Sequence, residues 1–149
     1  EEIGIDVRYN DRVLWPKSSP VAAINPAVSY YWEFDDNKDG ERNSFIGVGI
    51  DPELQPVRFG KVPVTISFPA SLGASWDGYY FNDRGGTQQV GYWMAGIQAA
   101  VDLPSSRNSP KCRLEAELDY IRMLADSTKR ANGGDNDDFT FRFGFAFQL

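Results

Sequence analysis

The chain of 149 residues contains no histidine. Without an imidazole it cannot form a Ser-His-Asp or Cys-His nucleophile or a histidine-ligated metal site, which excludes most familiar catalytic designs. Its one cysteine, Cys112, cannot form an intramolecular disulfide, and we interpret it as a small side chain within a strand. We therefore expect no enzymatic activity and no cofactor.

Long hydrophobic runs and a surplus of basic residues are also missing. No stretch reaches the roughly 18 consecutive apolar residues that a transmembrane helix needs. The 15 Lys and Arg residues are outnumbered by 21 Asp and Glu residues, for a net charge of −6, and they are scattered. This distribution excludes a nucleic-acid partner. The length predicts a single domain over residues 1–149.

What the chain does have is alternation of apolar and polar residues with a period of two, which is the pattern of β-strands. It is strictest at the C-terminus. There one face of a predicted strand carries Phe139, Phe141, Phe143, Phe145, Phe147 and Leu149, and the other carries small or polar residues. Five aligned phenylalanines indicate a fully paired strand pressed against an apolar environment, which is either a protein core or lipid.

The same period predicts strands along the rest of the chain, separated by segments rich in proline, glycine and acidic residues. Proline removes a backbone donor, so the fourth predicted strand should be bent, bulged or divided near Pro69. No helix is expected beyond one turn near residues 123–129. The fold class is therefore all-β, an antiparallel up-and-down meander of seven strands, or eight if the fourth divides, forming a transmembrane β-barrel or part of one. The predicted strands are residues 3–10, 27–34, 45–50, 62–76, 90–103, 112–120 and 139–149.

Alternation does not say which face is outside, because soluble sandwiches and calyces show the same period. Two groups of residues favour an apolar exterior over a polar lumen. The first is a set of candidate lumen charges, Arg113, Glu115, Glu117, Asp119 and Arg142. The second is a set of aromatic residues at strand ends that could form an interfacial girdle, Tyr30, Trp32, Trp76, Tyr79, Tyr80 and Trp93. The alternatives are a solvated charged face and aromatic lids on a soluble core.

Two acidic groups could carry chemistry. Glu115, Glu117 and Asp119 share one strand face, and we interpret them as lumen charges balanced by arginines, which would set ion preference in a pore or form a plug of salt bridges. The loop Asp35-x-Asn37-x-Asp39 reproduces the first half of a calcium-binding loop but lacks the acidic twelfth ligand. A calcium site and a plain solvated loop are both interpretations of this segment.

The last eight residues resemble the C-terminal signal of bacterial outer-membrane barrels, with Arg142, Gly144, Phe147 and Leu149 in its positions, although such proteins usually end on an aromatic residue. Residues 26–34, the hairpin reaching Gly49, the segments 62–67 and 77–80, and the Gly91-Tyr-Trp strand ending at residues 103–104 together resemble the C-terminal half of TorF-like porins. The resemblance implies a barrel larger than seven strands, of which this chain is a fragment or a short member. It also implies outer-membrane lipid and the barrel-insertion machinery as partners, and a homo-oligomer as a further option.

Our leading hypothesis is a bacterial outer-membrane β-barrel that serves as a porin-like passive channel or a structural barrel, without catalysis. The alternative is a soluble or surface-exposed β-sandwich or calyx that binds a ligand or protein partner through its aromatic-rich loops. An outer-membrane enzyme is a third hypothesis, which the missing histidine disfavours.

Overall fold

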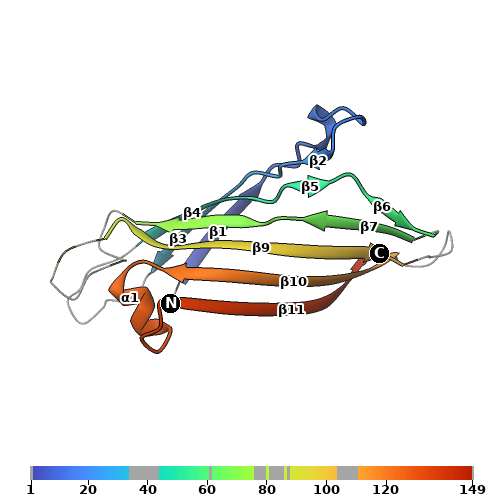
Figure 1. Ribbon diagram of the computed structural model, residues 1–149. Coiled ribbons are helices and arrows are strands. Elements are labelled where there is room, and N and C mark those ends of the chain that lie inside the picture. The colour runs from blue at the N-terminus through green and yellow to red at the C-terminus, as the bar shows by residue number, and fades with distance from the viewer. Residues whose placement is uncertain are drawn as a thin grey trace.

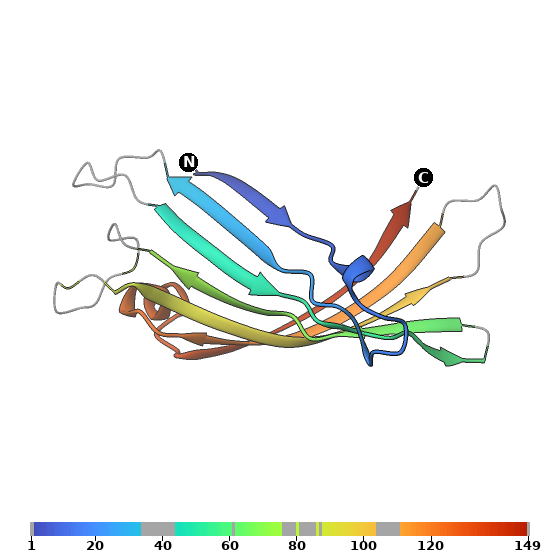
Figure 2. The same cartoon turned by 90° about the horizontal axis from the view of Figure 1, so that it is seen from above.

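The computed structural model describes residues 2–33, 44–60, 62–75, 80, 86, 88–103 and 111–148. Its strands form one antiparallel sheet of eleven strands that curls into a half-barrel (Figures 1 and 2). The elements in chain order are β1 (Glu2–Arg8), η1 (Arg12–Leu14), β2 (Val21–Ala23), β3 (Ala27–Glu33), β4 (Ser44–Ile50), β5 (Glu53–Leu54), β6 (Val57–Phe59), β7 (Val62–Ser67), β8 (Ala70–Ala74), β9 (Val90–Asp102), β10 (Lys111–Met123), α1 (Asp126–Ala131) and β11 (Asp137–Gln148).

The predicted division of the fourth strand at Pro69 is confirmed, and the two halves keep one register. Ser67 of β7 lies opposite Gln98 of β9, and Ala70 of β8 lies opposite Ala95, so no residue is inserted between them. The Gly96 N–H still donates to the Pro69 carbonyl at 2.8 Å. The proline therefore removes one donor from the ladder without displacing the row of residues.

Prolines also divide two other strands of the sheet into collinear pieces: Pro26 lies between β2 and β3, and Pro52 lies between β4 and β5. The Asp51 N–H donates to the Ile24 carbonyl between β2 and β3, and the Phe68 N–H donates to the Pro52 carbonyl between β4 and β5. The segment 51–60, which we expected to be a plain connection, instead adds β5 to the row of β4 and forms the hairpin strand β6. The main rows of the sheet are then β1, β2 with β3, β4 with β5, β7 with β8, β9, β10 and β11. Consecutive rows are neighbours, which confirms the antiparallel meander of seven to eight strands.

The distribution of buried and exposed side chains in this sheet is the reverse of that in a soluble domain: large apolar side chains are exposed, and small or polar ones are buried. Large apolar side chains are exposed along the outer face, including Ile5 at 66% and Phe141 at 69%. Apart from Tyr80, the buried side chains among the described residues are small or polar, and the largest one below 2% exposure is Asp119. Over the described residues there is therefore no apolar core between layers, and the large apolar side chains that are exposed face outward.

One short helix, α1, links β10 to β11 at one end of the half-barrel (Figure 1). It begins three residues after the start of the single turn that we expected, and the Thr128 hydroxyl fixes it by donating to the Gly91 carbonyl at 3.0 Å. β2 pairs with β5, and in Figure 1 η1 and β2 lie above β5, on the side of the sheet away from β11.

Candidate functional site: the polar inner face

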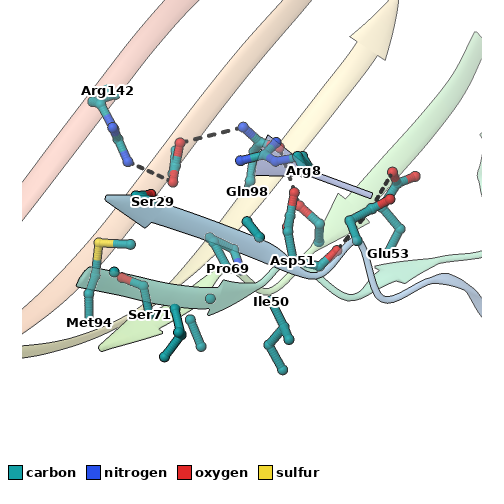
Figure 3. A pocket seen from close by; sticks show the side chains of 18 of the residues that line it. Arg8, Ser29, Ile50, Asp51, Glu53, Pro69, Ser71, Met94, Gln98 and Arg142 are labelled. Atoms are coloured by element: carbon teal, nitrogen blue, oxygen red, sulfur yellow. Dashed lines mark hydrogen bonds and ion pairs between the residues drawn. The ribbon is translucent and has the colours of Figure 1, made fainter. Parts of the chain in front are cut away.

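The inner face of the half-barrel lines a hollow of about 780 Å³. Because side chains alternate along each strand, the face opposite the exposed apolar residues is the one that faces this hollow. Its lining is drawn from every row of the sheet, and Figure 3 shows part of it. Charged lining residues are Arg8, Asp51, Glu53, Arg113, Glu115, Glu117 and Arg142.

A chain of polar contacts crosses the floor of the hollow from β11 to β7. Arg142 donates through Nη2 to Glu117 Oε1 and to Asp119 Oδ2, each at 2.8 Å. Figure 3 shows Arg142 and Gln98 approaching the network from opposite sides. Gln98 Nε2 donates to the second oxygen of Glu117 at 3.4 Å, and the Ser67 hydroxyl donates to Gln98 Oε1 at 3.2 Å. The strands thus place one cation between two carboxylates.

Asp119 is the buried anchor of this network, with only 1% of its surface exposed. It lies directly opposite Gly96 on β9, and a Cβ at Gly96 would collide with Asp119 Oδ1. The glycine therefore creates the space in which the carboxylate lies flat against the sheet. Asp119 Oδ1 has no hydrogen-bond partner among the described residues, so its negative charge depends on the contact of Oδ2 with Arg142.

Two tyrosine rings on the inner face also occupy the space left by a glycine on the neighbouring strand. Tyr31 covers Gly4 and Tyr92 covers Gly73, each directly across a strand pair. Glycine without a side chain lets a strand bend, and the ring restores packing over the exposed backbone. This pairing of glycine with a large cross-strand side chain gives the curled sheet a dense inner surface.

The five predicted lumen charges lie together on this face. Arg142 joins Glu117 and Asp119, while Arg113 Nε forms a separate ion pair with Glu115 Oε1 at 2.9 Å. No pair of carboxylates stands free in this group, because Glu117 and Asp119 share one guanidinium. The arrangement can orient water and ions along the hollow.

A second polar cluster, which the sequence analysis missed, lies at the rim beside η1. Asp11 accepts hydrogen bonds from the N–H groups of Ile24 at 2.8 Å and Asn25 at 3.0 Å, and from the Trp15 indole at 2.9 Å. Burial works to raise the pKa of the Asp11 carboxyl, but these hydrogen bonds outweigh it and hold the pKa below its ordinary value. The cluster pins the segment between β1 and β3 to the sheet.

Asn25 turns the chain within this rim cluster. Its φ of 49° is in the left-handed region, which asparagine tolerates better than most residues. Its side chain donates to the Asp51 carbonyl and to Glu53 Oε1, both at 3.1 Å, and Glu53 also pairs with Arg12. The dipeptide Asn25-Pro26 is a turn signal that could have revealed this site.

The predicted aromatic girdle is only partly assembled as expected. Tyr30, Trp32 and Trp93 are exposed on the apolar face. Trp93 also belongs to a row of rings across β9, β10 and β11, in which the Trp93 and Tyr120 centroids are 5.3 Å apart and those of Tyr120 and Phe139 are 5.2 Å apart. Tyr120 was not among the predicted residues, although it continues the alternation of its strand.

Tyr80 departs from the expectation. Only 2% of its surface is exposed, and its ring fills the place that a Cβ at Gly91 would take. It packs against the sheet and does not join the exposed rings. The remaining predicted members of the girdle, Trp76 and Tyr79, lie outside the described residues.

The C-terminal signal and the calcium loop are described only in part. Arg142 and Gly144 lie in the middle of β11, and the backbone of Phe147 pairs with Cys112 of β10. Leu149 and the loop residues Asp35, Asn37 and Asp39 lie outside the described residues. In the part of the chain that is described, no group of three or more metal-ligating side chains could hold a metal ion.

Comparisons with protein-family models, with curated proteins and with solved structures gave no match to this chain. Among the described residues, no helix is long and apolar enough to cross a membrane.

Proposed function

We propose that this chain forms the wall, or part of the wall, of a bacterial outer-membrane β-barrel. The barrel would be a porin-like passive channel or a structural barrel, without catalysis. The observation that carries the proposal is the inverted burial of the sheet, with apolar side chains exposed outward and polar side chains buried inward. On the resemblance of its sequence segments, the family we propose is that of the TorF-like porins.

The energetics of the outer face support this proposal. Transferring one phenylalanine-sized side chain out of water is favourable by about 1.5–3 kcal/mol. Along β11 alone, Phe139, Phe141, Phe143 and Phe145 are each more than half exposed. A continuous apolar surface of this kind is rare on soluble monomers and marks contact with a membrane or a partner. Lipid would cover it, while the ladders satisfy the backbone donors and acceptors within the sheet.

The polar hollow supports the channel version. Its charges are held by ion pairs, across β10 and β11 between Arg142 and the carboxylates of Glu117 and Asp119, and along β10 between Arg113 and Glu115, as in a water-filled lumen with a polar wall. The row of Trp93, Tyr120 and Phe139 crosses three strands near one end, where a barrel meets the membrane interface. The proposed partners are accordingly outer-membrane lipid and the barrel-insertion machinery, and the barrel could assemble further into a homo-oligomer.

The hollow also favours a second candidate, a soluble or surface-exposed calyx that binds a ligand. Its volume of about 780 Å³ falls within the range of small-molecule sites, about 300–1,000 Å³. The two candidates differ in what touches the phenylalanines of β11: lipid in the barrel and water or a partner in the calyx.

One pair of substitutions on β11 separates the candidates. Phe143→Arg places a charge on the outer face in mid-strand, and Thr140→Arg places the same charge on the inner face. In a lipid-facing wall the first should cost about 2–4 kcal/mol and abolish insertion into vesicles, while the second is tolerated. In a soluble calyx, Phe143→Arg should instead raise solubility. The readouts are flotation with lipid vesicles and heat-modifiable migration on a gel.

Conductance in planar bilayers tests the channel version separately. Folded, inserted protein without channel activity would leave the structural barrel and exclude the channel. The proposed insertion signal predicts that deleting residues 139–149 abolishes assembly altogether, whereas a soluble domain would lose stability gradually.

A further inference from the structure

The hollow of the inner face holds more carboxylates than guanidinium groups. Both the residues that line it and the charged side chains bonded directly to that lining contribute to this balance. When all of these groups are ionised, the negative charges outnumber the positive ones. The carboxylates are those of Asp6, Asp51, Glu53, Glu115, Glu117 and Asp119, and the guanidinium groups are those of Arg8, Arg12, Arg113 and Arg142.

Most of the positive charge is already bound by carboxylates of the same wall. An anion that entered the hollow would compete with these carboxylates for the same guanidinium donors. Arg142 serves two carboxylates at once, so its ion pairs still leave negative charge behind. The ion pairs are those of Arg12 with Glu53, Arg113 with Glu115, and Arg142 with both Glu117 and Asp119.

Several carboxylate oxygens of the inner face lack a positive partner. Both oxygens of Asp6 accept from the Tyr31 hydroxyl at 3.1 Å, and this neutral donor does not cancel their charge. Oδ1 of Asp51 and Oδ1 of Asp119 are buried without a hydrogen-bond partner among the described residues. Asp119 is only 1% exposed, and its Oδ1 lies over Gly96 on the inner face. A buried carboxylate oxygen without a donor is unfavourable, and a cation or its hydration water would relieve that cost.

The negative charge is spread around the hollow and is not gathered at one point. Figure 3 shows Asp51 and Glu53 next to each other, across the pocket from Arg142. In the described part of the chain, no three ligating side chains come together to hold a metal ion. A pore must attract an ion and also release it, so distributed fixed charge suits permeation better than tight binding.

We infer that the hollow selects small cations over anions, because its fixed carboxylates exceed the positive charge of its arginines. This inference rests on the proposed function, since it assigns the class of solute that the proposed channel passes. Surplus negative charge along a wall of low dielectric constant raises the local concentration of cations and lowers that of anions. The arginines oppose this only weakly, because carboxylates already occupy most of them.

Reversal potentials of the protein in planar bilayers, measured under a gradient of KCl, test the inference. At low salt we expect K⁺ to be at least about threefold more permeant than Cl⁻. Raising the ionic strength from about 0.1 M to about 1 M shortens the Debye length from about 10 Å to about 3 Å, so the permeability ratio should then fall toward one. Equal permeability at low salt, or a preference for Cl⁻, would overturn the inference.

Two substitutions in the lining should move the selectivity in opposite directions. Asp51→Asn removes a negative charge from the hollow and should lower the ratio of K⁺ to Cl⁻ permeability by about twofold, while Arg8→Gln should raise it by a similar factor. The matched control is Asp135→Asn, which removes the same charge from the turn before β11, outside the lining of the hollow. A shift for Asp135→Asn as large as that for Asp51→Asn would show that selectivity does not arise in the hollow.

The same recordings separate this inference from the proposed function. Folded, inserted protein that opens no channels would refute the channel, and the inference with it. Channels that show no preference for K⁺ would refute the inference alone and leave the proposed function in place.

Discussion

The regular half of the sheet, β9 to β11, and the interrupted half, β2 to β8, both span the half-barrel from end to end, but the first does so with long strands and the second with short ones. β9 and β10 have 13 residues each and β11 has 12, and none contains proline. The strands from β2 to β8 have between two and seven residues, with prolines between or within them. The register nevertheless continues across Pro69 and from β4 to β5, with shifts at Gly73/Ala74 and at Val21/Ala23. Proline removes ladder bonds here, but the neighbouring rows determine where each residue lies.

Polar side chains serve different purposes in the two halves. In the regular half they pair with one another across strands, as Arg142 does with Glu117 and Asp119. In the interrupted half they repair the backbone, as Asp11 does for the N–H groups of Ile24 and Asn25. In an uninterrupted strand the backbone groups pair in the ladder, so inner-face side chains can pair with one another across the lumen. In an interrupted strand some side chains hydrogen-bond to backbone groups that have lost their ladder partners.

The largest effect should come from a substitution that breaks the regular half, Gly96→Val. Its new side chain would meet Asp119 and, at 2.8 Å, the Leu118 carbonyl, which belongs to the backbone and cannot move aside. We expect a loss of about 2 kcal/mol or more in the free energy of unfolding, measured by urea denaturation in detergent micelles. Gly144→Val on β11 is the matched control, because nothing lies within 4 Å of its Cβ position. Equal losses for the two variants would contradict the close fit of Asp119.

The charge network of the regular half should respond asymmetrically. Arg142→Met removes the partner of a carboxylate that is 1% exposed, while Asp119→Asn removes the partner of a guanidinium whose side chain is 61% exposed. Removing one member of a buried pair costs about 3–5 kcal/mol, and solvent access at Arg142 should reduce this to about 2 kcal/mol. Asp119→Asn should cost about 1 kcal/mol.

The double variant sharpens this comparison. With Asp119→Asn already present, Arg142→Met no longer removes the partner of the 1% exposed Asp119 carboxylate. It still removes the guanidinium from Glu117, which keeps the hydrogen bond from Gln98, so its added cost should be smaller than its cost alone. Urea midpoints of the four proteins complete the cycle. Strict additivity would show that the two groups do not depend on each other.

The regular half was predictable from sequence because nothing in it competes with the period of two. The alternation over residues 139–149 and 112–120 placed β11 and β10 correctly, together with the face on which Glu117 and Arg142 lie. The interrupted half was predicted less well. Residues 51–60 contain two prolines and no clear alternation, yet the neighbouring β7 provides a ladder on which β5 and β6 form.

The sequence did not predict which side chains, distant along the chain, contact each other in the sheet. Alternation says that Asp119 and Gly96 face inward, but only the register between β9 and β10 puts one over the other. Tyr80 was expected outside because tyrosines gather at membrane interfaces, and instead it fills the space over Gly91. In the Asp11 cluster, Asn25-Pro26 signals the turn, but nothing in the sequence pairs that turn with a carboxylate 14 positions earlier.

Lowering the pH should weaken the interrupted half through Asp11. Its pKa in the folded protein lies below the ordinary 3.8, so its contribution to stability is present above that pH and is lost as the pH falls through the lower folded value. Asp11→Asn should therefore lower the urea midpoint at pH 7 and make little difference once wild-type Asp11 is protonated. Asp135→Asn, in the turn before β11, is the carboxylate control. A constant difference between wild type and Asp11→Asn from pH 7 to pH 2.5, about one unit below the ordinary value, would contradict this assignment.

The smallest effect should come from mending a break, with Pro69→Val. The Pro69 carbonyl already accepts from the Gly96 N–H, and a valine N–H at this position would face the Gly96 carbonyl in return. The new hydrogen bond should contribute about 0.5–1.5 kcal/mol, but loss of the proline's restriction of the unfolded chain offsets about 0.4–1 kcal/mol of it. The net change in the free energy of unfolding should stay within about 1 kcal/mol, while amide exchange at residue 69 becomes slow and β7 and β8 become one strand. A large loss of stability would show instead that Pro69 determines the curvature of the sheet, and that the breaks shape the half-barrel as well as interrupting it.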